Sequence, residues 1–304
     1  MRNTFSRALV LAAKRDPKLV LMTGDHGYSL FDDIRKTCPN QYLNVGVAEQ
    51  NMVGMAAGLA KAGFHPIVYG LSAFVPIRVL EQIKLDVCYE NLPVIFVGDG
   101  AGVVYSTLGA SHQSAEDIAA LRAVPNICIL SPADEHEMVT CLKLAFDCKG
   151  PAYLRIGKSD LGTFHSNPPA LKLGELACLK AGGNQSAWIA TGSMVAAALA
   201  VSKNWKGSSV YSAPTIKPLN ESSVLEICKN HKSVIVLEEH SIYGGLGSAI
   251  AEIASLSHPT PICRIGIQDK FSKFCGSYQY LISEHQLDPQ SIQLQVEHFQ
   301  QQIQ

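Results

Sequence analysis

The sequence contains no hydrophobic run long enough to cross a membrane, and it lacks an excess of charge of either sign. Its 304 residues include 25 Lys and Arg against 26 Asp and Glu, for a formal net charge of −1. A membrane-spanning helix needs about 20 predominantly apolar residues, and a nucleic-acid-binding surface needs a clear excess of positive charge. We therefore expect neither a membrane nor a nucleic acid among the partners of this chain.

Paired cysteine spacings and an amino-terminal leader are also absent. The nine cysteines are scattered, odd in number and never arranged as C-x-x-C, which argues against a disulfide framework or a zinc site. The first residues lead directly into a helical pattern, without the apolar run of a signal peptide. We interpret the cysteines as reduced thiols and expect a cytoplasmic protein.

The composition that is present favours a well-packed α/β protein. Apolar residues make up 47% of the chain and charged residues 17%, which is untypical of a disordered chain. Short apolar runs, typical of buried parallel strands, alternate with helical periodicity. In the first half we expect such strands at residues 19–22, 67–69, 93–97, 127–130 and 152–155. This alternation predicts a doubly wound, mostly parallel sheet.

The length allows two domains, each with its own core. A polar stretch at residues 166–169 is interrupted twice by proline and marks the break between them. We predict a first domain at residues 1–165, a linker at residues 166–183 and a smaller α/β domain at residues 184–304.

One carboxylate, Glu49, stands among small and apolar neighbours at residues 45–54. Burial in such surroundings raises the pKa of an acid, because it disfavours the charged form. A carboxylic acid of this kind can share a proton with a basic nitrogen of a ligand. The alternative is a glutamate at a helix amino terminus that backbone N–H groups satisfy.

Two other side chains are candidates for a site. Phe74 precedes a predicted helix that carries Arg78, and it is either a core residue or a platform for a ligand ring. His112 ends the long, glycine-bearing loop at residues 98–112, and long loops are often functional. It is either a solvated or structural histidine, or a group that handles protons and polarises a carbonyl oxygen.

Several motifs resemble those of the transketolase family of thiamine diphosphate enzymes. GVAEQ at residues 46–50 resembles the family's G-(I/V)-A-E-Q, and GASHQ at residues 109–113 resembles D-G-x-T-H-Q. EEHSIYGGLG at residues 238–247 resembles E-E-H-x-x-x-G-G-L-G, which we interpret as a structural turn with domain-contact duties. The matches run in family order over almost the whole chain, but the first transketolase domain has no counterpart. The chain is therefore similar to the carboxyl-terminal subunit of a split transketolase.

The resemblance implies a role for each matching residue. Glu49 would contact the aminopyrimidine ring of thiamine diphosphate, on which Phe74 would stack, with Asp25 and Arg78 completing the cofactor-binding set. His112 would reach the substrate and act in catalysis together with Glu49.

The resemblance also implies an anion site. Arg2, Ser29 and Arg155 match positions that hold the phosphate of a sugar phosphate, and arginine suits this task because its planar fork binds phosphate bidentately. Arg155, at the end of a predicted strand, is the strongest candidate, with Lys158 as a nearby alternative. Arg2 is equally compatible with a surface position.

Two positions in the loop at residues 98–112, here called the substrate loop, depart from the family pattern. Leu108 stands where transketolases have an aspartate, and Gly100 stands where they have a histidine and deoxyxylulose-phosphate synthases an arginine. Loss of the aspartate removes an acceptor for a substrate hydroxyl and would leave that hydroxyl unpaired. We predict that the donor or the acceptor differs from the ordinary pentose phosphates, and we count both positions as substrate-binding.

One further pattern is similar in spacing to a metal-binding motif. Asp99, in GDG at residues 98–100, is followed by Asn126 at nearly the spacing of the G-D-G…N motif for magnesium diphosphate. That motif needs its asparagine just after a strand, and Asn126 precedes one. We therefore predict no metal site in this chain.

Taken together, the resemblance implies an enzyme that transfers a two-carbon ketol or related acyl unit from a keto donor to an aldehyde acceptor. Thiamine diphosphate would be shared with an amino-terminal partner subunit that holds Mg²⁺, in an α2β2 heterotetramer with a homodimer contact through the first domain. Three alternatives stay open: a 2-oxo acid dehydrogenase β subunit, a deoxyxylulose-phosphate synthase-like enzyme, and a non-catalytic partner-binding or regulatory subunit.

Overall fold

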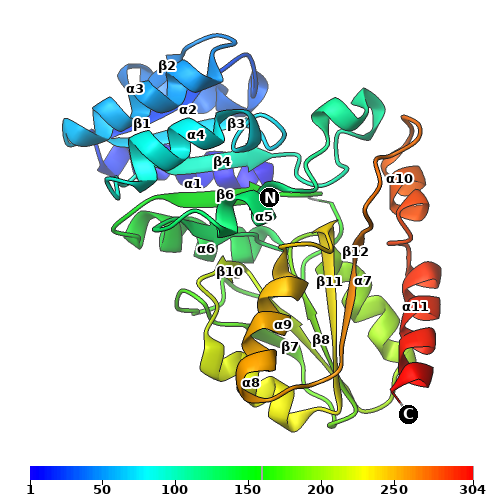
Figure 1. The fold of residues 1–304 in the computed structure, drawn as a ribbon. Helices are drawn as coiled ribbons and strands as arrows, with labels where there is room; N and C mark the ends of the chain where they lie inside the picture. Colours follow the sequence, from blue (N-terminus) through cyan, green and yellow to red (C-terminus); the bar gives the residue numbers. More distant parts are fainter. Residues whose placement is uncertain (159, 304) are drawn as a thin grey trace.

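The computed structural model describes residues 1–158 and 160–303, in which two sheets form the centres of two α/β units (Figure 1). The first sheet has the strand order β10-β5-β6-β4-β3-β1-β2, and only β10 is antiparallel to its neighbour. Its strands are β1 (Leu19–Thr23), β2 (Tyr42–Asn44), β3 (His65–Leu71), β4 (Ile95–Asp99), β5 (Cys128–Leu130), β6 (Ala152–Ile156) and β10 (Thr215–Lys217). This mixed α/β architecture with a mostly parallel sheet confirms the predicted fold class.

Helices cover both faces of the first sheet. Adjacent residues of a strand point to opposite faces, so Ile67 packs with α1 (Arg2–Arg15) and α6 (Glu135–Asp147), whereas Val68 packs with α3 (Glu49–Lys61) and α5 (Asp117–Arg122). The remaining helices, α2 (Asp32–Thr37) and α4 (Leu80–Gln82), are short. Asp134 caps α6 by accepting two backbone N–H groups.

The second unit repeats the plan on a smaller scale. Its strand order is β12-β11-β8-β9-β7, built from β7 (Ala177–Lys180), β8 (Ser186–Ala190), β9 (Ser208–Ser212), β11 (Ser233–Ser241) and β12 (Ile262–Ile267). Helices α8 (Glu221–Asn230) and α9 (Leu246–Ser257) pack together, as do α7 (Met194–Val201) and α11 (Pro289–Gln302). The short α10 (Tyr278–Glu284) precedes α11 near the first unit (Figure 1).

The structure differs from the sequence prediction at three places. Residues 166–183, predicted as a linker, include β7, which pairs antiparallel with β9 and belongs to the second sheet. Strand β10 belongs to the second half of the chain in sequence, but it pairs with β5 and forms an edge strand of the first sheet. The helix predicted to carry Arg78 is broken into a tight turn at Ile77–Val79, α4 and a wider π-type segment at Ile83–Cys88.

Candidate active site

Glu49 is the first residue of α3, and its acidic side chain is buried, with the residue only 4% exposed. Its Oε2 lies 3.2 Å from Nη1 of Arg78, and its Oε1 lies 3.9 Å from Nε2 of His26. Among the described residues, the partners of the Glu49 carboxylate are thus side chains of other segments, and not backbone N–H groups of α3. The carboxylate therefore faces other side chains across the carboxyl edge of the sheet instead of only capping its own helix.

An aromatic cluster adjoins this carboxylate. The guanidinium carbon of Arg78 lies 3.9 Å from the ring centroid of Phe74. The ring of His112 also packs against Phe74, edge to face at 5.3 Å between centroids, and the ring of His26 lies at 5.9 Å. The fold thus brings Glu49 and His112 together with Phe74 and Arg78, which belong to one segment after β3.

His26 is a member of this cluster that the sequence interpretation missed. Its Nε2 is buried and has no hydrogen-bond partner among the described residues. Asp25, predicted to bind the cofactor, instead accepts a hydrogen bond from the Tyr28 hydroxyl on the exposed side of the same turn. The turn that holds both residues follows the carboxyl end of β1, where ligands bind in open α/β sheets, and a strand end alone does not show which of two neighbours turns inward.

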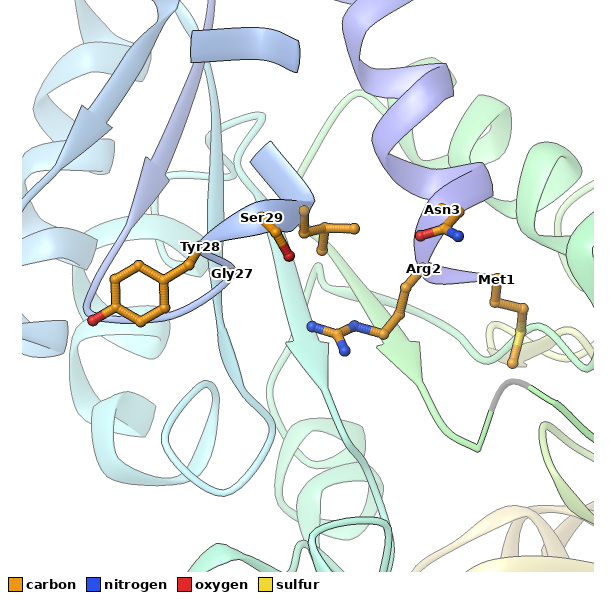
Figure 2. Close-up of a pocket in the computed structure, with 7 residues that line it drawn as sticks. Met1, Arg2, Asn3, Gly27, Tyr28 and Ser29 are labelled. Carbon is orange, nitrogen blue, oxygen red and sulfur yellow. The ribbon is translucent and has the colours of Figure 1, made fainter. Parts of the chain in front are cut away.

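A cavity of about 600 Å³ lies at the start of α1, next to the turn that follows β1. It is lined by Met1, Arg2, Asn3, Gly27, Tyr28, Ser29 and Leu30. Figure 2 shows Arg2 and Ser29 extending from different segments toward the same hollow. Arg2 is oriented by Asp99, whose Oδ2 lies 3.2 Å from its Nε. The structure therefore brings together two of the three residues predicted to hold a phosphate.

The third residue, Arg155, lies in a buried ion pair away from this cavity. Its side chain is 2% exposed, and its Nε donates to Oδ2 of Asp117 at 2.7 Å. Its Nη2 donates to the backbone carbonyl oxygens of Glu239 and Ser114 at 2.9 and 3.3 Å. The prediction that Arg155 binds substrate is wrong for this structure, because the guanidinium links the two units and is shielded from solvent.

Lys158 is more exposed than Arg155. It follows β6, whose last residue Ile156 is in register with Asp99 at the end of β4. Its ammonium pairs with the exposed Asp160 at 2.8 Å and is only partly buried. Lys158 was the predicted alternative to Arg155 for holding a phosphate, and of the two only Lys158 is accessible to solvent.

Leu108 and Gly100, the two positions that depart from the family pattern, have different structural surroundings. Leu108 is 51% exposed, so its apolar side chain is available to line a substrate path. Gly100 has a φ of 73°, and a Cβ there would overlap the ring of Tyr105. The absence of a side chain at residue 100 is thus required by the backbone and by Tyr105 together.

The metal-like pattern is used for other contacts. Asp99 accepts hydrogen bonds from the hydroxyls of Tyr69 and Tyr105, and Nδ2 of Asn126 donates to the carbonyl oxygen of Cys88 at 2.9 Å. Asn126 itself occupies a turn with a φ of 70°. Across residues 1–158 and 160–303, no cluster of three or more His, Cys, Asp or Glu side chains is arranged to hold a metal ion.

The polar residues at the end of β11 serve the structure, as interpreted from the sequence. Glu238 accepts the N–H groups of Leu246 and Gly247 at 2.7 and 2.9 Å, and burial raises its pKa to about 7. His240 accepts the N–H of Ala119 in the first unit at 3.2 Å, and burial lowers its pKa to about 4. These side chains are committed to the turn before α9 and to the contact between the units.

Comparisons with known proteins agree with this architecture. The profile described as "Transketolase, pyrimidine binding domain" matches residues 1–163, and "Transketolase, C-terminal domain" matches residues 174–292. No helix in the described part of the chain is long and apolar enough to cross a membrane.

Two curated relatives and one solved structure illustrate the similarity. The chain is 32% identical to the 6-deoxy-6-sulfo-D-fructose transketolase subunit SqwH of Clostridium sp. (strain MSTE9), covering 92% of this chain and 88% of that one. It is 35% identical to the 1-deoxy-D-xylulose-5-phosphate synthase of Caldanaerobacter subterraneus subsp. tengcongensis (strain DSM 15242 / JCM 11007 / NBRC 100824 / MB4), covering 95% of this chain but 47% of that protein. A structure described as "Split gene transketolase, inactive beta4 tetramer" superposes with a TM-score of 0.89 and 31% identity, covering 98% of this chain and 97% of that one.

Proposed function

This chain belongs to the transketolase family, and we propose that it is the carboxyl-terminal subunit of a split enzyme that transfers a two-carbon ketol unit to an aldehyde acceptor. The two family domains account for almost all of its length, and the split-gene structure matches it end to end. The single observation that carries the catalytic part of the proposal is the convergence of Glu49, Phe74 and His112 at one edge of the sheet.

The residues at this edge fit the aminopyrimidine half of thiamine diphosphate. A buried carboxylate, an aromatic ring and the Nε2 of His26, which has no partner among the described residues, lie within a few ångströms of one another. A ring with basic nitrogens and an exocyclic amine would give hydrogen-bond partners to groups that now lack them. When bound, the cofactor supplies a thiazolium carbon that becomes nucleophilic once it loses a proton.

Each side chain at this edge would then have a separate role. Glu49 would hold a proton on its carboxyl group for a pyrimidine ring nitrogen, in a site largely closed to water. Phe74 would support the ring from below, and Arg78, which now covers Phe74, would have to leave that face. His112, whose Nδ1 lies 3.0 Å from the Ser111 hydroxyl, would present Nε2 to a substrate oxygen.

The substrate end of the site is the cavity that holds Arg2 and Ser29. Their guanidinium and hydroxyl groups suit an oxyanion on the substrate, with Lys158 as the second cation. Leu108 lines the loop with an apolar surface and disfavours a donor whose hydroxyl would need an acceptor there. We infer a substrate that carries an anionic group but differs in hydroxylation from ordinary pentose phosphates.

The diphosphate and Mg²⁺ would be held by a separate amino-terminal subunit, in an α2β2 assembly with this chain's first unit contributing a homodimer contact. Support comes from the coverage of almost the whole length of split relatives. We place the enzyme in the cytoplasm and in carbohydrate metabolism.

The experiment is reconstitution with the candidate amino-terminal subunit, followed by turnover assays with a panel of ketose and keto-acid donors. Turnover that requires both chains, thiamine diphosphate and Mg²⁺ is expected. Activity of either chain alone would contradict the proposal, and a mixture that assembles but never turns over any donor would favour a non-catalytic subunit.

A second candidate is a deoxyxylulose-phosphate synthase-like or 2-oxo acid dehydrogenase-type reaction. It is favoured by the exposed Leu108, since a 2-oxo acid donor carries no hydroxyl that needs the lost aspartate. Pyruvate decarboxylation without ketose consumption in the same donor panel would select this candidate over ketol transfer.

A further inference from the structure

A buried carboxylate at the end of β4 joins the substrate loop to the Arg2 cavity. Asp99 is 3% exposed, and its Oδ2 accepts hydrogen bonds from the hydroxyls of Tyr69 at 2.7 Å and Tyr105 at 3.1 Å. The same oxygen lies 3.2 Å from Nε of Arg2. Burial and the Asp99 charge raise the pKa of both tyrosines, so their hydroxyls stay protonated and donate.

Tyr105 and Gly100 form a matched pair. Gly100 adopts a φ of 73°, which favours glycine, and a Cβ on it would overlap the Tyr105 ring. Any side chain at residue 100 would therefore displace the ring and remove one hydrogen bond from Asp99. The unusual glycine is required if Tyr105 is to reach Asp99.

Arg2 is fixed through one nitrogen and remains available through the others. Asp99 faces Nε, while the Arg2 side chain keeps 45% of its exposure and lines the cavity opposite Ser29 (Figure 2). A guanidinium held at Nε presents its two terminal nitrogens in a fixed fork, which matches the spacing of two oxyanion oxygens. An unsupported arginine on the first turn of a helix would sample many rotamers and lose this advantage.

The backbone of Asp99 also contacts the cofactor side of the edge. The backbone carbonyl of Asp99 accepts the N–H of Ser72 at 2.8 Å, in the loop that leads to Phe74. Tyr105 belongs to the loop that ends at His112. Asp99 thus lies where the anion cavity, the substrate loop and the Phe74 loop meet.

We infer that Asp99 and Tyr105 are positioning residues that orient Arg2 toward a tetrahedral oxyanion, either a phosphate ester or a sulfonate. The assignment of that oxyanion to a substrate rests on the proposed function, whereas its binding to this chain does not. In this arrangement, loss of the Tyr105 hydroxyl weakens anion binding without touching the anion.

The test is titration of inorganic phosphate, and separately of methanesulfonate, into the isotope-labelled chain, followed by the backbone amide shifts of Arg2 and Ser29. We expect saturable shifts with at least one anion, and the anion that binds more tightly identifies the chemistry. Tyr105→Phe and Asp99→Asn are each expected to weaken binding about tenfold, the loss of one charge-assisted contact. No saturable response to either anion, or variants that bind as tightly as the native chain, would overturn the inference.

Matched controls separate positioning from general damage. Tyr280→Phe on α10 and Asp147→Asn at the end of α6 change exposed residues of the same types and should leave the titrations unchanged. Gly100→Ala should reproduce the effect of Tyr105→Phe, because it displaces the ring. Melting curves of all variants check that each is folded.

A kinetic readout uses the reconstituted enzyme with glyceraldehyde 3-phosphate and glyceraldehyde as acceptors. Tyr105→Phe should raise KM for the phosphorylated acceptor alone and leave kcat unchanged. An equal loss for both acceptors would show a merely structural role and overturn the inference. Absence of any turnover by the native pair would count against the proposed function, while the phosphate titration would still decide the inference.

Discussion

The two α/β units share an architecture but use the carboxyl ends of their strands differently. In the first unit, Glu49, His26 and Phe74 face one another, and one buried nitrogen among them has no partner in the described residues. In the second, Glu238 and His240 accept backbone N–H groups from the following turn and from the other unit. Polar residues at a strand end therefore mark a ligand site only where the chain has not already satisfied them.

The largest expected effect falls on catalysis in the first unit. Glu49→Gln keeps the size of the side chain but removes the exchangeable proton, so turnover of the reconstituted enzyme should fall by roughly 100-fold to 10,000-fold. Affinity for the partner subunit and the melting temperature should change little. Steady-state kinetics and sedimentation of the complex measure both, and a variant with native turnover would remove Glu49 from the mechanism.

A comparable effect on stability is expected where the units meet. Arg155→Met leaves Asp117, which is 0% exposed, without its cation, and breaking a buried ion pair typically costs about 3–5 kcal/mol of unfolding free energy. Lys143→Met, in an exposed pair with Asp147, is the control and should cost no more than about 0.5 kcal/mol. Denaturant titration gives both values, and equal costs would mean that the junction contributes no special stability.

The free energy of unfolding should depend on pH through His240 of the second unit. Because the folded-state pKa of His240 is lowered to about 4, its contribution is complete above the unfolded value of about 6.5 and is lost as pH falls toward 4, by on the order of 3 kcal/mol. Glu238, raised to about 7, has the opposite sign: its contribution is complete below about 4.5 and is lost as pH rises toward 7.

These two trends oppose each other in the native chain. His240→Gln should therefore gain stability relative to the native chain as pH falls from 6.5 to 4.5, since only the glutamate trend remains. Urea unfolding at several pH values measures this difference. Parallel pH profiles for the variant and the native chain would show that His240 is not held neutral by the fold.

The smallest effect concerns specificity. Leu108→Asp restores an acceptor at the exposed loop position and should improve kcat/KM for xylulose 5-phosphate by about tenfold, the value of one good hydrogen bond. Leu256→Asp, at a more exposed site in the second unit, is the control. No gain for Leu108→Asp would show that residue 108 does not set the choice of donor.

The sequence predicted the fold class because parallel strands buried on both faces leave continuous apolar runs, as at residues 93–97. It also drew attention to Glu49, Phe74 and His112, which the structure then brings together. It did not predict β10, since three residues are too few for a periodic signal and its pairing with β5 depends on the tertiary fold.

The errors at the site have one physical origin. Position at a strand end places a residue at the right edge of the sheet but does not show which partner takes its side chain. Arg155 was misassigned because Asp117, far away in sequence, holds its guanidinium. His26 was missed because the turn after β1 directs it, and not Asp25, toward Glu49.

The most direct test of the account is calorimetric titration of thiamine diphosphate and Mg²⁺ into this chain, into its candidate amino-terminal partner and into their complex. The account predicts tight binding only in the complex, because this chain offers the ring-binding side chains of Glu49 and Phe74 without a diphosphate and metal site. Tight binding of both ligands by this chain alone would contradict it and would show that the first unit holds more than half of a cofactor site.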